Sequence, residues 1–550
     1  MRSGLTRRAL MGGALSAVAG VALAEPLRVV PRPGARPGAV APGRPVSREE
    51  AGLVVPHLVP LAEVVAAAGL GGITGVCVAD MATGTVLEEL AGGVPLPPAS
   101  VAKALTAIYA QAVLGPEFRF ETRLVATGPV AEGVVQGDLV LAGGGDPRLV
   151  TDDLAGLAGR LRAAGVRGVT GAFGVWGGAL PFQARIDPGQ LDHLGYNPAV
   201  GGLNLNFNRV HFEWRRAGGD WQLAMDARSD LYRPPVSIAR IGIAERERPV
   251  YTYADGGGYD RWTVARAALG DGGSRWLPVR YPALYAGEVL RGFAVAEGVD
   301  LPAPREVDAL PAGEVVAAWE SPPLDQMIGD MLEYSTNITA EALGLSASRA
   351  RGLDPVTLAQ SAGALGRWAR GALGVEVALQ DHSGLSDASR VAAREMVLAL
   401  VAGGGTVTGL MKRIEMTDAE GEPLVPQPAE VAAKTGTLNF VSCLAGRLRT
   451  ARGADLVFAI FSAEPERRAR AIASGDEVPD GVPEWGAGAR RLQQVLLRRW
   501  AAARPARTRP GAAVRASCGG RGRRVRWRRR AGGRSTALRG FPRACGLRGR

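Results

Sequence analysis

The sequence predicts an α+β protein in which a region of helices and strands is interrupted by a long segment of different composition. Strand-like apolar runs at 73–80, 85–90, 434–450 and 454–462 alternate with stretches of helical periodicity. Residues 121–280 are richer in glycine and in short strands, which indicates a β-rich insertion. At 550 residues the chain is long enough for more than one domain.

Helices are expected where apolar residues recur at helical spacing between start and stop residues. The expected helices cover 47–68, 100–114, 152–164, 283–297, 323–333, 337–350, 390–402 and 487–502. Inside the insertion, short strands are expected at 123–126, 138–142 and 203–214. The glycine-rich stretch Gly143–Pro147 lacks the lysine of a phosphate-binding loop, so we interpret it as a strand-to-turn connection.

The first residues have the features of an export signal. In residues 1–24, three arginines precede an apolar stretch, and Ala22-Leu-Ala24 matches a cleavage site. Thr6-Arg-Arg-Ala-Leu10 fits a twin-arginine signal, and a general secretory signal is the alternative. Residues 25–46 are rich in Pro, Gly and Arg and predict a linker. These features predict an exported, periplasmic protein. No other segment has 18 consecutive apolar residues, so we expect no transmembrane segment in the processed protein.

The net charge of +12 belongs to the end of the chain. Residues 501–550 hold 16 Arg and no acidic residue, and removing these charges leaves −4 for the rest. A nucleic-acid partner is therefore not expected for the body of the protein. Residues 504–550 lack apolar periodicity and predict an Arg-rich tail without fixed structure, dispensable for folding and catalysis. A basic arm that binds nucleic acid or an anionic polymer is the alternative interpretation of this tail.

The cysteines and histidines do not form a metal-binding pattern. The four cysteines, Cys77, Cys443, Cys518 and Cys545, include no closely spaced pair, and the four histidines are scattered. We expect neither a metal nor another cofactor. Cys77 and Cys443 lie in strand-like runs, where they are either small core residues or partners in a disulfide.

Three short clusters stand out: Ser100-Val-Ala-Lys103, Ser335-Thr-Asn337 and Lys434-Thr-Gly436. Only three of the 65 Lys and Arg residues are lysines, and two of those lie inside the clusters. Arginine cannot act as a base, because its pKa stays above about 12, whereas burial lets a lysine do so. One Ser-x-x-Lys is a weak pattern, but the three clusters in this order are specific.

The first cluster suits nucleophilic catalysis. Ser100 and Lys103 share a helix face, and the free N–H groups at the helix start favour a developing negative charge. Serine is a weak nucleophile, which a neutral Lys103 amine would activate. The alternative interpretation is a capping serine beside a surface lysine. No Gly-x-Ser-x-Gly motif is present, and Asp381-His-Ser383 is too compact for a catalytic triad.

The other clusters supply groups for a proton relay and for substrate binding. Ser335 is a candidate to pass a proton to a leaving amine, and Asn337 to hold Lys103 and a substrate amide. Lys434, with the Thr435 and Thr437 hydroxyls, suits a carboxylate.

Two further features of the third cluster concern the strand backbone. Gly436 has no side chain, so an extended substrate can approach the strand there. The N–H groups of Thr437 and Ser100 are candidates for an oxyanion hole.

With these clusters the chain resembles the class C penicillin-binding proteins, which are D-alanyl-D-alanine carboxypeptidases and endopeptidases that trim peptidoglycan peptides. The resemblance covers about residues 50–502. Its supporting stretches are Pro98–Lys103, Gly137–Pro147, Ser321–Leu324, Asp381–Ser386 and Lys434–Gly446. The family carries an insertion between its first two motifs, which fits the 235 residues that separate Ser100 from Ser335.

The resemblance implies a β-lactamase/transpeptidase-like catalytic domain, in which an antiparallel sheet packs between helices. Its two parts are expected at 47–120 and 281–503, split by the β-rich insertion at 121–280. Ser100 would attack the D-Ala–D-Ala carbonyl of a peptidoglycan stem peptide, and β-lactam antibiotics would acylate it. A β-lactamase or esterase on the same fold, and a non-catalytic cell-wall-binding protein, are the alternatives, while carboxypeptidase and endopeptidase activity are left undivided.

Overall fold

A five-stranded antiparallel sheet organises the part of the chain that holds all three clusters. The computed structural model describes residues 53–54, 59–474 and 476–505, so the predicted export signal and linker, and the tail beyond Pro505, lie outside the described residues. The strand order is β21-β22-β23-β2-β3. The strands are β2 (Ile73–Asp80), β3 (Val86–Leu90), β21 (Ala429–Leu438), β22 (Val441–Thr450) and β23 (Asp455–Ala463).

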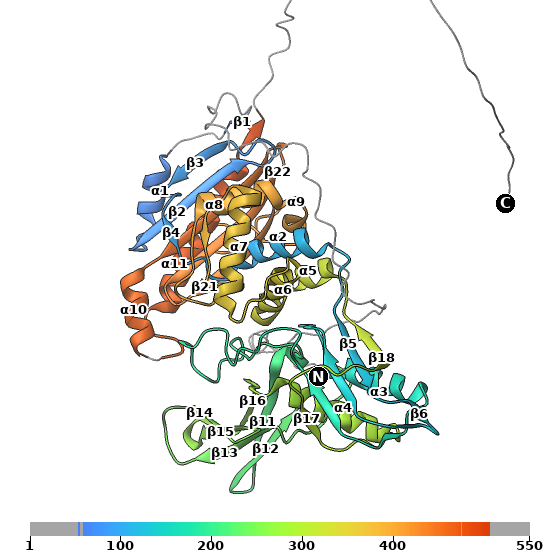
Figure 1. Ribbon diagram of the computed structural model, residues 1–550. Helices are drawn as coiled ribbons and strands as arrows, with labels where there is room; N and C mark the ends of the chain where they lie inside the picture. Colours follow the sequence, from blue (N-terminus) through green and yellow to red (C-terminus); the bar gives the residue numbers. More distant parts are fainter. Residues whose placement is uncertain (1–52, 55–58, 475, 506–550) are drawn as a thin grey trace, which may run out of the picture. The chain divides into compact units, whose positions relative to one another are not determined.

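Alternate residues of the sheet enter two different cores, because successive side chains of a strand point to opposite faces. In β23, Phe458 packs with α11 (Val482–Ala501) and with the first residue of α1 (Leu61–Ala67). The next residue, Ala459, packs in the larger core on the other face. The sheet is therefore sandwiched between helices, as the resemblance implied (Figure 1).

The larger core contains the helices that carry the first two clusters. Figure 1 shows α2, α6, α7 and α8 grouped on one side of the sheet. The helices are α2 (Ala102–Leu114), α5 (Leu324–Tyr334), α6 (Asn337–Ala350), α7 (Leu358–Leu373) and α8 (Ala393–Gly403). Two shorter helices follow in the chain, α9 (Gly405–Gly409) and α10 (Pro465–Ser474).

Small sheets complete this region. Strand β20 lies between β19 and β4, and β1 pairs with β24. Their bounds are β1 (Leu53–Val54), β4 (Pro95–Leu96), β19 (Val377–Ala378), β20 (Arg390–Ala392) and β24 (Arg504–Pro505). The tail was expected to lack fixed structure from residue 504, but its first two residues form β24.

The inserted region has its own core. A mixed five-stranded sheet, ordered β17-β10-β8-β5-β18, packs with α3 and α4. These elements are β5 (Glu121–Ala126), β8 (Leu139–Gly143), α3 (Thr151–Ala163), β10 (Phe173–Trp176), α4 (Pro282–Ala296), β17 (Pro304–Glu306) and β18 (Glu314–Glu320). Strand β8 runs into an irregular connection at Gly144, which confirms the strand-to-turn interpretation of Gly143–Pro147.

Three smaller sheets belong to the same region, ordered β12-β11-β16, β13-β15-β14 and β6-β7-β9. Their strands are β6 (Val130–Ala131), β7 (Val134–Val135), β9 (Gly168–Val169), β11 (Arg209–Ala217), β12 (Asp220–Asp226), β13 (Ala239–Ala244), β14 (Tyr251–Asp255), β15 (Asp260–Ala265) and β16 (Gly272–Pro278). The second core continues through α4 to Ala317, beyond the end predicted at residue 280. Periodicity locates a helix such as α4, but does not tell which core its apolar face joins.

Two predicted strands are wrong in their extent. The run predicted as one strand over 434–450 breaks at Asn439–Phe440, where Phe440 has a φ of +56°, and its halves pair as the β21–β22 hairpin. The run over 203–214 begins instead with a turn at Leu205–Asn208, in which Asn206 and Phe207 are left-handed. Neither turn contains the glycine that usually marks such a conformation.

The first helix is shorter than expected, and three helices were missed. Of the predicted helix at 47–68, the described residues contain α1 from Leu61 to Ala67. Helices α7, α9 and α10 were not predicted. In α11, Leu492, Leu496 and Trp500 are buried as expected, whereas Val495 is 38% exposed.

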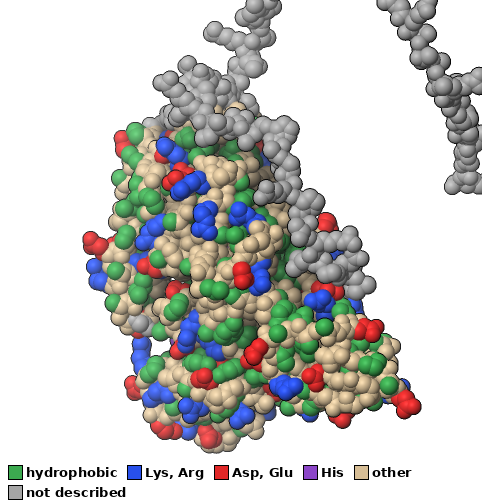
Figure 2. Space-filling view, viewed as in Figure 1, with side chains coloured by type: hydrophobic (Ala, Val, Ile, Leu, Met, Phe, Trp, Pro, Cys, Tyr) green, Lys and Arg blue, Asp and Glu red, His purple; other side chains and the backbone are tan. Residues whose placement is uncertain are grey.

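None of the helices in the described part of the chain is long and apolar enough to cross a membrane. On the face shown in Figure 2, side chains of both charges are interspersed.

Candidate active site

Ser100 lies in a tight turn at the start of α2. Residues Ala99–Val101 form one turn of 3-10 helix, and Ala99 has a φ of +47°, which L-residues adopt at a cost of about 1–3 kcal/mol. Such strain at a nucleophile turn is held by the surrounding packing. Here the packing comes from β21, because a side chain at Gly436 would lie 2.8 Å from Pro98 O and 3.0 Å from Ser100 N. The missing side chain at Gly436 therefore makes room for the turn that carries Ser100.

Lys103 lies one helical turn after Ser100 and is wholly buried. Its Nζ is 2.9 Å from Ser100 Oγ, 2.7 Å from Asn337 Oδ1 and 2.9 Å from Ser383 O. A neutral amine has two N–H donors and one lone pair. The amide oxygen and the carbonyl can only accept, so they take the two donors, and the lone pair is left for the Ser100 hydroxyl proton.

The electrostatic surroundings of Lys103 favour this neutral form. Burial and, to a smaller extent, the positive charge of Lys434 lower the pKa of Lys103 to about 7, against the opposing effect of the carboxyls of Asp381 and Glu341. A pKa near 7 leaves a large fraction of the amine free to accept a proton at neutral pH.

Ser335 and Asn337 lie where α5 ends and α6 begins. Ser335 ends α5 with a φ of +61°, a position where glycine is usual. Asn337 is the first residue of α6, and Thr336 occupies the N-cap position without a side-chain capping hydrogen bond. Among the described residues, no hydrogen bond joins the Ser335 hydroxyl to Ser100 or Lys103.

The inserted region reaches this site through Tyr196. Its carbonyl accepts a hydrogen bond of 2.8 Å from Asn337 Nδ2, on the side of the amide opposite to Lys103. The loop that carries Tyr196 is held by the buried Arg280 guanidinium, which donates to the carbonyls of Ala184, Asp192 and Asn197 at 2.7–3.0 Å. Sequence reasoning missed this contribution, because a backbone carbonyl leaves no mark on residue identity.

Lys434 lies on β21, the outer strand of the sheet, and is buried. Burial, followed by the positive charge of Lys412, lowers the pKa of Lys434 to about 8, and the carboxylate of Glu333 opposes this. Its Nζ donates to the carbonyl of Thr435 at 2.9 Å. Thr435 and Thr437 are exposed on the same strand.

The loop Asp381–Ser386, singled out in the sequence without a role, contributes the Ser383 carbonyl that contacts Lys103. His382 is buried, with Nε2 2.8 Å from Ser361 Oγ, so its ring is engaged away from Ser100. The arrangement agrees with the rejection of a compact Asp-His-Ser triad.

The two cysteines in the described part of the chain are not joined by a disulfide. Cys77 and Cys443 are free and buried, and burial raises the pKa of Cys77 to about 12. Over the part of the chain that the structure describes, no group of three His, Cys, Asp or Glu is arranged to hold a metal ion.

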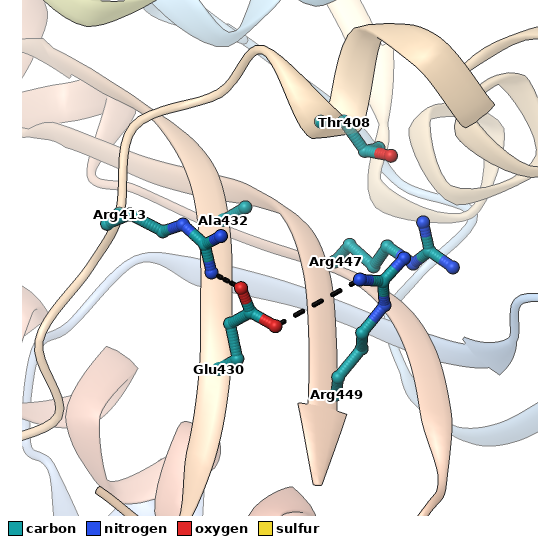
Figure 3. A pocket seen from close by; sticks show the side chains of 7 residues that line it. Thr408, Arg413, Glu430, Ala432, Arg447 and Arg449 are labelled. Atoms are coloured by element: carbon teal, nitrogen blue, oxygen red, sulfur yellow. Dashed lines mark ion pairs between the residues drawn. The ribbon is translucent and has the colours of Figure 1, made fainter.

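A separate polar pocket lies along the β21–β22 pair (Figure 3). Arg413 and Arg449 flank Glu430 there, and Arg447 pairs with Asp455. None of the eight predicted site residues lines this pocket. Its guanidinium groups are paired with carboxylates of the chain itself.

An antiparallel sheet packed between helices, with a serine and a buried lysine at the start of α2, defines a serine enzyme of the penicillin-binding class. Residues 59–478 match the model of the D-Ala-D-Ala carboxypeptidase 3 (S13) family. The chain belongs to this family, whose members are serine D-Ala-D-Ala carboxypeptidases.

Individual relatives agree with this assignment. The D-alanyl-D-alanine carboxypeptidase of Actinomadura sp. (strain R39) is 30% identical over 450 residues, which cover 71% of this chain and 78% of that protein. The crystal structure of penicillin binding protein 4 from Haemophilus influenzae has a TM-score of 0.64 at 19% identity, covering 80% of this chain and all of that one. A second structure of that protein, in complex with a β-lactam, has a TM-score of 0.61 at 20% identity and covers 79% of this chain and 99% of that one.

Proposed function

We propose that the chain hydrolyses the terminal D-Ala–D-Ala bond of peptidoglycan stem peptides through an acyl-enzyme on Ser100. The observation that carries this proposal is the environment of Lys103. Its two acceptor partners, Asn337 and Ser383, leave the amine lone pair for the Ser100 hydroxyl at 2.9 Å. A surface lysine beside a capping serine would have neither this burial nor these partners.

In acylation, Lys103 Nζ takes the hydroxyl proton while Ser100 Oγ bonds to the carbonyl carbon of the penultimate D-Ala. The C–N bond then breaks, and the departing D-Ala amine receives a proton, for which Ser335 is the proposed relay. The N–H groups of Ser100 and Thr437 are the proposed donors to the oxyanion. Water then attacks the ester, and the serine regains its proton.

Lys434 is the proposed anchor for the substrate carboxylate. Its positive charge lowers the pKa of Lys103, and Gly436 on the same strand packs against the turn that carries Ser100. The exposed hydroxyls of Thr435 and Thr437 add donors along the outer strand β21, whose edge suits an extended peptide. Asn337 Nδ2 donates to the carbonyl of Tyr196, and a carbonyl oxygen of the substrate would accept a hydrogen bond from the same side chain.

Lys434→Ala is expected to lower kcat/KM for a D-Ala–D-Ala peptide. The fall should correspond to about 2–4 kcal/mol of lost transition-state stabilisation, the size of a charge-assisted contact in a closed site. Removing this positive charge also raises the pKa of Lys103, so the rate should begin to rise at a higher pH. In the unaltered enzyme, activity on carboxylate substrates should fall above about pH 8, as Lys434 loses its charge. The measurement is kcat/KM against pH for matched substrates with a free and an amidated C-terminus.

Lys412→Ala is the matched control for this prediction. Lys412 is near enough to lower the pKa of Lys434, but it is paired with Glu333 at 2.7 Å on the surface. Its loss should leave the rate at neutral pH unchanged and move the fall in activity to higher pH. Equal losses on free and amidated substrates in Lys434→Ala would show that Lys434 does not bind the carboxylate.

Two experiments test the reaction itself. Mass spectrometry after treatment with benzylpenicillin should place the adduct on the peptide that contains Ser100, and an adduct elsewhere would refute the mechanism. Digestion of purified peptidoglycan then separates the two activities, because a carboxypeptidase releases D-Ala and an endopeptidase releases uncross-linked muropeptides. Fast turnover of penicillin with no release of D-Ala would favour a β-lactamase instead.

We also propose that the protein acts outside the cytoplasm. The features that support this are the arginines, the apolar stretch and the Ala22-Leu-Ala24 site in residues 1–24. Peptidoglycan stem peptides would then be its substrates in the periplasm, and β-lactams its covalent inhibitors. Recovery of periplasmic protein that begins at Glu25 would support the proposal, and retention of the uncleaved chain in the cytoplasm would oppose it.

A further inference from the structure

The Ser383 carbonyl that orients Lys103 belongs to a segment without helix or strand. Residues Asp381–Ser389 connect β19 to β20, and none of them belongs to a regular element. Such a segment has no ladder of hydrogen bonds to hold its peptide units, so other groups must satisfy its buried N–H and C=O groups. Ser383 is wholly buried, and its carbonyl accepts from Lys103 Nζ at 2.9 Å.

Glu341 holds the two peptide units at the centre of this segment. It lies one helical turn after Asn337 on α6, so both side chains share one face of the helix. Its Oε2 accepts the N–H of His382 and its Oε1 accepts the N–H of Ser383, each at 2.9 Å. The Glu341 side chain is wholly buried, and both carboxylate oxygens are used.

The rest of the segment is held just as tightly. Asp381 accepts the N–H groups of Gly384 and Ser386, and Thr106 on α2 donates to the His382 carbonyl at 2.7 Å. Gly384 has a φ of +77°, and a side chain there would lie 1.9 Å from Ala99 O. The segment therefore contacts the turn that carries Ser100, and a shift of Ser383 would also change the position of this turn.

We propose that Glu341 is a positioning residue for acylation, which clamps the amides of His382 and Ser383 so that the Ser383 carbonyl holds one N–H of Lys103. With Asn337 holding the other N–H, the Lys103 lone pair is directed at Ser100 Oγ. Glu341 does not contact Ser100 or the substrate, and it acts through the backbone. This inference rests on the proposed role of Lys103 as the base.

The charges around Glu341 give a readout besides rate. Asp381 and His382 lie next to it on the loop and Lys103 lies on α2, with Lys434 acting on Lys103 from β21. Burial lowers the pKa of His382 to about 3, so it is neutral. Burial and Asp381 raise the pKa of Glu341, whereas the His382 N–H, a hydrogen bond from Ser383 and the charge of Lys103 lower it and favour the ionised carboxylate that accepts both amides. In turn, the carboxylates of Asp381 and Glu341 raise the pKa of Lys103.

Two variants separate position from charge. Glu341→Gln replaces one acceptor by an N–H donor, which faces a backbone N–H and releases the clamp. Glu341→Asp keeps the charge, but its shorter side chain cannot reach both amides. Glu320→Gln is the matched control, since Glu320 is a buried carboxylate on β18 outside the site.

The experiment measures the rate constant of acylation by benzylpenicillin against pH, together with the final amount of adduct and the melting temperature. Both Glu341 variants should acylate about 10- to 100-fold more slowly, the loss expected from misplacing a catalytic group by about 1 Å. In Glu341→Gln the rise of the rate should also move to lower pH, because Lys103 loses a neighbour that raises its pKa. Glu320→Gln should acylate within about twofold of the unaltered enzyme.

A merely structural role gives a different result. Partial unfolding lowers the amount of adduct, but the protein that remains folded keeps its rate constant and its pH dependence. If both Glu341 variants acylate within about twofold of the unaltered enzyme and the rise stays at the same pH, the inference is overturned. Failure of the unaltered enzyme to form an adduct on Ser100 would instead overturn the proposed function.

Discussion

Replacing Ser100 by alanine is expected to abolish the penicillin adduct and to lower D-Ala release by at least about 10⁴-fold, or about 5.4 kcal/mol. The alanine variant keeps the turn and its packing but has no oxygen to form the ester. Its fold should survive, because the hydroxyl is half-buried and, among the described residues, is hydrogen-bonded to Lys103 alone. The measurements are adduct formation, D-Ala release and the melting temperature, which should change by no more than a few degrees.

A cysteine variant provides the control for this result. Ser100→Cys keeps a nucleophile at the same position, so it should still form an adduct, though at a different rate. Adduct formation by the alanine variant at the same site would show that another group is acylated. Loss of the melting transition in the alanine variant would leave the test to Ser100→Cys, whose adduct must still be on that residue.

Replacing Lys103 by alanine should slow acylation by about 10²- to 10⁴-fold, the usual contribution of a general base. In the unaltered enzyme, acylation should rise with pH through about 7, because burial lowers the pKa of Lys103 to that value and only the neutral amine accepts a proton. The alanine variant should lose this rise. Arginine should not restore the rate, since its guanidinium stays protonated.

The measurement for Lys103 is the rate constant of acylation between pH 5 and pH 9 in the unaltered enzyme and in Lys103→Ala, Lys103→Arg and Lys412→Ala. Lys412→Ala should keep the rise near pH 7, because Lys412 is exposed and paired with Glu333. A rise that persists unchanged in Lys103→Ala would assign the base to another group. No rise at all in the unaltered enzyme would contradict the neutral-lysine mechanism.

Several elements were predictable because their information is local. Helix α6 was expected at 337–350 and spans Asn337–Ala350, and strand β2 was expected at 73–80 and spans Ile73–Asp80. In both, apolar periodicity runs between clear boundaries. The pairing of Ser100 with Lys103 was predictable for the same reason, since residues three apart share a helix face.

Other features followed from packing and were missed. The left-handed Phe440 divides the strand predicted over 434–450, and its buried ring packs against Trp485, far along the chain. The positive φ values of Ala99 and Ser335 are likewise imposed by neighbours, because neither residue prefers that conformation. Local pattern therefore located the residues of the clusters but not the strained backbone that presents them.

The order and the residue types of the three clusters were enough to indicate a serine enzyme and its class. The two lysines inside the clusters added to this indication, because lysine is rare in this arginine-rich chain. Only the tertiary structure brought the Ser383 carbonyl to Lys103, Glu341 to the amides behind it, and the Tyr196 carbonyl to Asn337. These contacts join segments up to 280 residues apart, and most are made by backbone groups that every residue possesses. The pKa of Lys103 was equally inaccessible from sequence, because burial sets it and burial exists only once the cores have packed.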